Sequence, residues 1–67
     1  MSEEIQKELI QKVFSKFHSE SFIYNVLSSL RDDSQRQKLI QYLDDNDVLS
    51  KTDVEIQMMR IKGLTSY

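Results

Sequence analysis

Residues 9–30 carry the sequence LIQKVFSKFHSESFIYNVLSSL, in which one pattern of apolar residues occurs twice. The first copy comprises Leu9, Ile10, Val13, Phe14 and Phe17, and the second comprises Phe22, Ile23, Val26, Leu27 and Leu30. The spacing i, i+1, i+4, i+5, i+8 places each set along one side of an α-helix. The linking residues 18–21 are polar. The stretch therefore predicts two helices that form an antiparallel hairpin. The first covers about residues 3–17, and Ser19 or Ser21 is the N-cap of the second.

A third helix is predicted after the polar break at residues 31–34. Ser34 and Gln37 have the spacing of a capping box, in which two side chains bond each other's backbone amides at a helix start. The apolar face of this helix comprises Leu39, Ile40 and Leu43. We expect the helix to end in the acidic run 44–47. Negative side chains are unfavourable there, because the C-terminal end of a helix is the negative end of its dipole. The alternative is that the second and third helices form one continuous helix, because only the polar cluster indicates a break between them.

The fourth helix has the clearest start signal in the chain. Ser50 has the position of the N-cap, and Asp53 stands three residues later as its capping-box partner. Thr52 with Glu55 is a rival capping box two residues further on. Two apolar residues occupy the hydrophobic-staple positions around this start: Leu49 and Val54. The only glycine, Gly63, suits the left-handed residue that follows a helix end. We expect the helix to run to the residue before it, and residues 64–67 to form a short flexible tail.

Length and composition restrict the chain to a small all-α bundle of about four short helices. Its 67 residues form a single domain near the lower size limit for folding without disulfides or metal. The chain has no cysteine, no proline, one glycine and one histidine, which excludes glycine-rich phosphate loops and the usual zinc sites. Tyr24 and Tyr42 are expected at the core edge with their hydroxyl groups in water. Self-association or a bound partner is expected to add stability.

The charge pattern makes the middle of the chain its acidic part. Net charge is −2 at pH 7, and all aspartates lie between Asp32 and Asp53. This balance gives no general attraction to nucleic acid or to anionic lipid. No apolar run approaches the roughly 20 residues that span a bilayer. Residues 1–4 have neither a basic start nor an apolar stretch, so we expect a cytoplasmic protein without a membrane partner.

Catalytic residue types cluster only around His18, whose neighbours include Ser15, Ser19 and Glu20. These residues all belong to one helix end and the turn after it. A catalytic triad instead needs a base oriented by a third group within a sheltered pocket. We therefore expect a solvent-facing histidine, and neither enzyme activity, a cofactor nor a small-molecule substrate.

Residues 42–53 partly match the calcium-binding loop of an EF-hand. The positions that would supply ligands hold Tyr42, Asp44, Asn46, Ser50 and Asp53. The first position should be an aspartate, the sixth, Asp47, should be glycine, and the last should be a longer glutamate. These departures predict no metal site, and a degenerate calcium-responsive module is one alternative function.

Residues 37–62 also have the outline of a helix-turn-helix. The second helix of that motif would present Lys51, Thr52, Glu55, Gln57 and Arg60 to DNA. Val48 stands where the turn normally has glycine, and acidic residues at the turn would face the phosphate backbone. Direct nucleic-acid binding is therefore the second alternative and not the leading prediction.

The fourth helix is apolar on two sides. One stripe comprises Val54, Met58 and Ile61, whereas Ile56 and Met59 point to the opposite side at 100° per residue. The helix is buried centrally, or Ile56 and Met59, flanked by Arg60, form a binding patch, or the two are scattered exposed residues without a role. The acidic residues expected to steer a basic partner are Asp44, Asp45 and Asp47. The leading prediction is a small non-enzymatic interaction module, a regulator, adaptor or inhibitor, that binds a protein or a second copy of itself.

Overall fold

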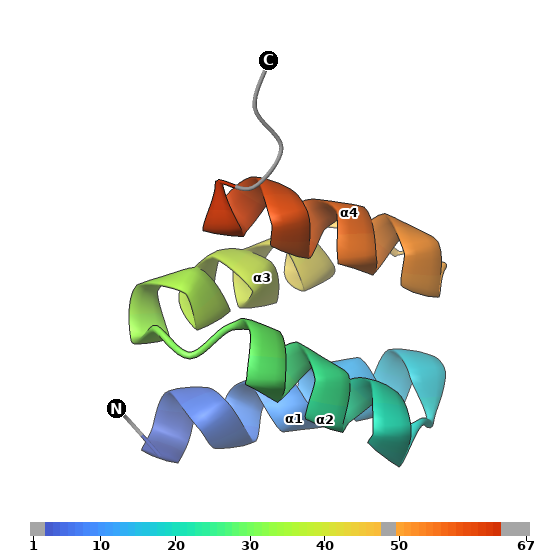
Figure 1. The fold of residues 1–67 in the computed structure, drawn as a ribbon. Coiled ribbons are helices and arrows are strands. Elements are labelled where there is room, and N and C mark those ends of the chain that lie inside the picture. Colours follow the sequence, from blue (N-terminus) through green and yellow to red (C-terminus); the bar gives the residue numbers. More distant parts are fainter. Residues whose placement is uncertain (1–2, 48–49, 64–67) are drawn as a thin grey trace.

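The computed structural model describes residues 3–47 and 50–63, and the chain forms four helices within them. They are α1 (Glu3–Phe17), α2 (Glu20–Ser29), α3 (Asp33–Asp45) and α4 (Lys51–Lys62). Figure 1 shows α2 returning along α1 and α4 returning along α3, each in the opposite direction. Helix α1 packs against α2 and α3, and α3 also packs against α4. The predicted all-α bundle and its first antiparallel hairpin are thus confirmed.

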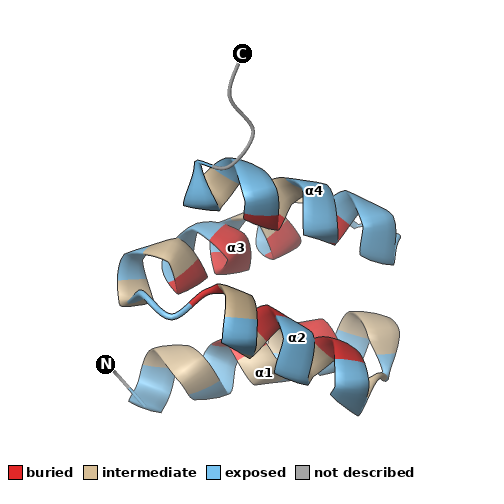
Figure 2. Ribbon diagram, in the orientation of Figure 1, coloured by how far each residue is buried: buried red, intermediate tan, exposed pale blue. Residues whose placement is uncertain are grey.

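The core is built from the apolar stripes of all four helices. Its buried members are Leu9, Val13, Phe22, Val26, Leu30, Leu39, Ile40, Leu43, Val54 and Met58. Figure 2 shows these positions on the sides of the helices that face one another. Tyr42 packs against this core, as predicted, but Tyr24 is 75% exposed and its predicted place at the core edge is wrong. Tyr24 follows buried Phe22 by two positions, and two positions on a helix carry a side chain to the opposite face.

Local capping signals account for three of the helix ends. Ser19 Oγ accepts a hydrogen bond from the Phe22 backbone amide at 3.2 Å and starts α2. The predicted capping box of α4 is present, with Asp53 N–H donating to Ser50 Oγ at 3.1 Å and Ser50 N–H donating to Asp53 Oδ2 at 3.3 Å. Gly63 ends α4 with a φ of 74°. The staple residue Leu49 and the predicted flexible tail, residues 64–67, lie outside the described residues.

The predicted start of the third helix is wrong. Helix α3 begins at Asp33, and its N-cap Asp32 makes no side-chain capping bond. Ser34 therefore lies inside the first turn instead of at the cap. The break before α3 is real, since Leu30 and Asp32 both have extended backbone and α2 and α3 are separate. Close to this start, the buried Arg36 of α3 makes hydrogen bonds to α2 and α1.

Arg36 holds the turn between α2 and α3. Its side chain is buried, with 4% of the residue exposed. Its Nε donates to the Leu30 carbonyl at 2.6 Å, and its Nη2 donates to the Leu27 carbonyl at 3.4 Å. Its Nη1 donates to Gln6 Oε1 of α1 at 3.2 Å. The guanidinium therefore satisfies carbonyls at the end of α2, and its charge suits the negative end of that helix dipole.

Lysines of α1 meet the acidic end of α3. Lys12 Nζ lies 2.5 Å from Asp44 Oδ1, and Lys16 Nζ donates to the Asn46 carbonyl at 2.9 Å. The hydrogen bond with Asp44 raises the pKa of the Lys12 amine above its ordinary value. Positive charge at a helix C-terminus is favourable, so these lysines offset the unfavourable aspartates.

His18 follows α1 in a left-handed backbone conformation, with a φ of 49°. This conformation costs an L-residue about 1 kcal/mol or more, whereas glycine adopts it freely. The His18 ring also stacks edge-on against Phe14, with ring centroids 5.5 Å apart. We expect His18→Gly to have a free energy of unfolding about 1 kcal/mol higher than His18→Ala, since both lose the ring contact and only alanine keeps the strain. Urea titration of the two variants measures the difference, and equal midpoints would contradict the assignment of strain.

Candidate protein-interaction surface

Helix α4 buries one side and exposes the other. Val54 and Met58 are buried and Ile61 is half-buried, so the predicted stripe faces the bundle. Ile56 is 40% exposed and Met59 is 42% exposed. Helix α4 packs on α3 at the edge of the bundle (Figure 2), and its exposed side borders α2 across a groove. The structure thus excludes central burial of this side, and Ile56 and Met59 lie on the surface.

The exposed pair lies in a shallow groove between α4 and α2. Helix α2 contributes Asn25 and Ser29 as one wall of this groove. Helix α4 contributes Thr52, Glu55, Ile56, Met58, Met59 and Lys62. The groove thus combines three apolar side chains, one of them the buried Met58, with polar walls and one charge of each sign. This combination is typical of a site for a protein segment, in which apolar anchors are surrounded by a polar rim.

The acidic residues predicted to bind a partner lie apart from this groove. Asp44 is bound to Lys12, and Asp45 Oδ1 accepts a hydrogen bond from Gln41 Nε2 at 3.1 Å. Asp47 is exposed after the end of α3. Asp45 lines a different hollow that also involves Ile61, on another side of α4. The structure therefore does not bring the acidic run and the pair Ile56 and Met59 together into one site.

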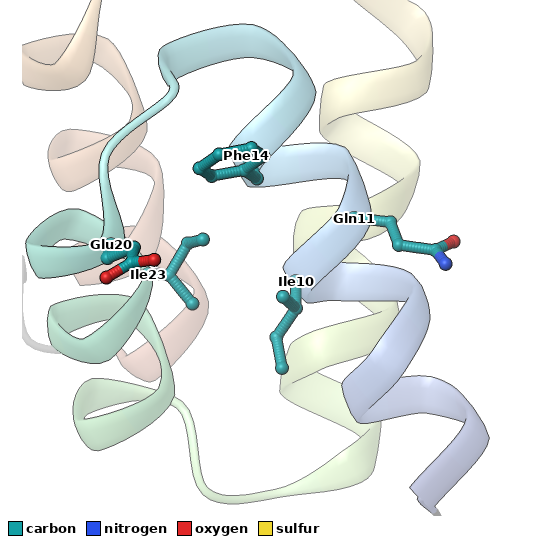
Figure 3. Close-up of a pocket in the computed structure, with 5 residues that line it drawn as sticks. All are labelled: Ile10, Gln11, Phe14, Glu20 and Ile23. Carbon is teal, nitrogen blue, oxygen red and sulfur yellow. The ribbon is translucent and has the colours of Figure 1, made fainter.

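A second apolar groove lies between α1 and α2, and sequence reasoning missed it. Ile10, Phe14 and Ile23 point toward the space between the two helices, whereas Gln11 extends away from it (Figure 3). Phe14 is 42% exposed. The signal was present in the first stripe, because apolar residues at i, i+1, i+4 and i+5 form a face broader than one neighbouring helix covers.

The residues of the calcium-binding pattern are engaged in structural contacts. Asp44 binds Lys12, Asp53 belongs to the capping box of α4, and Asn46 Nδ2 donates to the Tyr42 carbonyl at 2.8 Å. Within residues 3–47 and 50–63, no group of three or more histidine, cysteine, aspartate or glutamate side chains is placed to hold a metal ion. His18 is exposed beside an aromatic ring. None of the helices in the described part of the chain is long and apolar enough to cross a membrane.

Helices α3 and α4 differ in arrangement from a helix-turn-helix. In that motif the two helices cross at about 90–120°, so that the second projects into the major groove. Here α4 runs back alongside α3 (Figure 1). Lys51, one of the residues that the motif would present to DNA, lies over the ring of Phe22, with its amine 5.7 Å from the ring centroid.

Comparison with protein-family models, with curated proteins and with solved structures gives no match. In the groove between α2 and α4, the exposed apolar residues Ile56 and Met59 meet charges of both signs.

Proposed function

We propose that this protein is a small non-enzymatic interaction module, a regulator, adaptor or inhibitor, that acts in the cytoplasm by covering a protein surface. The observation that supports this proposal is the joint exposure of Ile56 and Met59. They are three residues apart on α4 and therefore lie next to each other on the helix surface. Methionine side chains adapt their shape to different partners, and adjoining exposed apolar residues mark interaction sites.

Charged residues give the proposed surface its rim. Arg60 is exposed one position after Met59, and Glu55 and Lys62 line the groove itself. Charges at a rim affect the rate and specificity of association more than its affinity. Asp45 and Asp47 are exposed elsewhere, so in this proposal they act on a basic partner at a distance while Ile56 and Met59 make the contact.

We expect the double variant Ile56→Glu plus Met59→Glu to stay folded and to lose partner binding. Both side chains are on the surface, so the free energy of unfolding should fall by no more than about 1 kcal/mol. Two buried carboxylates at the contact would, in contrast, abolish binding because a charge without a partner is costly to bury. Circular dichroism checks the fold, and retention of proteins from a cell extract on the immobilised variant checks binding.

Phe14→Glu is the matched control for this experiment. Phe14 has the same exposed fraction as Met59 but lies in the groove between α1 and α2. The proposal expects this variant to retain the same proteins as the wild type. Loss of retention in Phe14→Glu, with normal retention by the double variant, would move the interaction surface to α1 and α2 and overturn the proposal.

A further inference from the structure

The exposed side of α4 has the spacing of a helix–helix seam. Thr52, Ile56, Met59 and Gly63 follow one another at intervals of four, three and four residues, and all four are exposed. This alternation keeps the side chains of Thr52, Ile56 and Met59 in a row along α4, as in the seam of a coiled coil, and Gly63 follows as the C-cap of the helix. The two larger residues occupy the middle of the row. The small residues at its ends leave room for the backbone of a second helix to approach.

Charges lie on both flanks of this row in a regular order. One flank carries Glu55 and Lys62, which line the groove, and the other carries Asp53 and Arg60. On each flank the acidic residue is nearer the start of α4 and the basic residue is nearer its end. The helix dipole favours this order along the axis. It does not explain why the charges border the exposed apolar pair on both sides.

A second copy of α4, turned by a two-fold axis, complements this pattern. With the axis midway between Ile56 and Met59, the Ile56 of each copy meets the Met59 of the other. Antiparallel helices bring like flanks together, so Glu55 faces Lys62 on one flank and Asp53 faces Arg60 on the other. The two-fold axis repeats each pair, and a surface that complements itself in this way is what a symmetric dimer requires. A parallel pair would instead set Ile56 against Ile56 and leave Lys62 without an acidic residue opposite.

We infer that the partner of the groove is a second copy of this chain, held by antiparallel contact between the two α4 helices. This inference rests on the proposed function and names the partner for the same surface. One helix pair buries less area than the roughly 1,200–2,000 Å² of a stable interface, so the dimer forms at micromolar or higher concentrations. In this dimer, the α4 helix of the second copy lies beside the wall of the groove formed by Asn25 and Ser29 of α2.

Sedimentation equilibrium of two charge reversals tests the inference. Each of Glu55→Lys and Lys62→Glu alone turns two attractive pairs of the dimer into repulsive pairs, and we expect each to weaken self-association about tenfold. When the two variants are mixed in equal amounts, every mixed dimer has all its pairs attractive again. The mixture is therefore expected to associate as the wild type does, while each variant alone stays largely monomeric.

A second mixture controls for net charge. Lys38 is exposed on α3 and lines the hollow that Ile61 also borders, so Lys38→Glu makes the same change of charge away from the seam. Glu55→Lys mixed with Lys38→Glu has the same net charges as the first mixture but is expected to associate less. Lys38→Glu chains have an intact seam and pair with one another, whereas Glu55→Lys chains find no fully complementary partner and stay largely monomeric. Circular dichroism confirms that each variant is folded before the masses are compared.

Three results would overturn the inference: a wild type that stays monomeric up to about millimolar concentration, equal association in both mixtures, or a dimer unaffected by Ile56→Glu plus Met59→Glu. A monomeric wild type that still retains another protein through Ile56 and Met59 removes the self-association and leaves the proposed function standing. A monomer that retains nothing removes both.

Discussion

Arg36→Ala is expected to lower the free energy of unfolding by about 3 kcal/mol, because a buried cation holds together the ends of three segments. The substitution removes donors from the carbonyls of Leu30 and Leu27 and from the side-chain oxygen of Gln6. A buried acceptor that loses its donor costs about 1–3 kcal/mol. A domain of this size has a total stability on the order of 3–10 kcal/mol, so a large part of it would be lost.

Two further arginine variants make this prediction specific. Arg36→Lys keeps the charge but has a single point-like donor group in place of the planar fork, so we expect it to recover less than half of the loss. Arg31 is exposed in the same turn, and Arg31→Ala should stay within about 0.5 kcal/mol of the wild type. Urea unfolding followed by circular dichroism gives all three values. Equal losses for Arg36→Ala and Arg31→Ala would show that the buried hydrogen bonds do not hold the turn.

Leu39→Ala is expected to cost about 2–5 kcal/mol of unfolding free energy. Leu39 is fully buried on α3, the helix that packs against both α1 and α4. Truncation removes apolar surface from the core and leaves a cavity that the surrounding helices fill only in part. The small core has few other buried side chains to sustain the fold, so the variant should be partly unfolded at 25 °C without denaturant.

Tyr24→Ala provides the contrast for this core variant. Tyr24 is the larger side chain, but it is 75% exposed on the outer face of α2. Its removal should change the free energy of unfolding by no more than about 0.5 kcal/mol. Thermal unfolding, with both variants scanned at one concentration, tests the pair. A Tyr24→Ala loss as large as that of Leu39→Ala would mean that the outer face of α2 is covered in solution.

The surface of α4 shows how far sequence reasoning reaches toward a functional site. The spacing of Val54, Met58 and Ile61 predicts the buried side of the helix, and the structure agrees. The same spacing places Ile56 and Met59 opposite, but it cannot tell whether another element covers them. That depends on the position of α4 at the edge of the bundle, which follows from the packing of all four helices. The groove shared with Asn25 and Ser29 was not predictable for the same reason, since α2 is more than twenty residues away in the chain.

The sequence by itself determined the features of this protein that arise within one turn of helix. The apolar stripes, the Ser19 cap, the Ser50 and Asp53 capping box and the glycine after α4 all depend on residues three or four positions apart. The tertiary structure decided where Arg36 is buried, where α3 begins, and which groups of α3 and the residue after it meet Lys12 and Lys16, namely the Asp44 carboxylate and the Asn46 carbonyl. These contacts join residues that are distant in the chain, and their energies exist only after the helices have packed. The exposure of Ile56 and Met59 belongs to this second group, because a helix has an outer side only in relation to its neighbours.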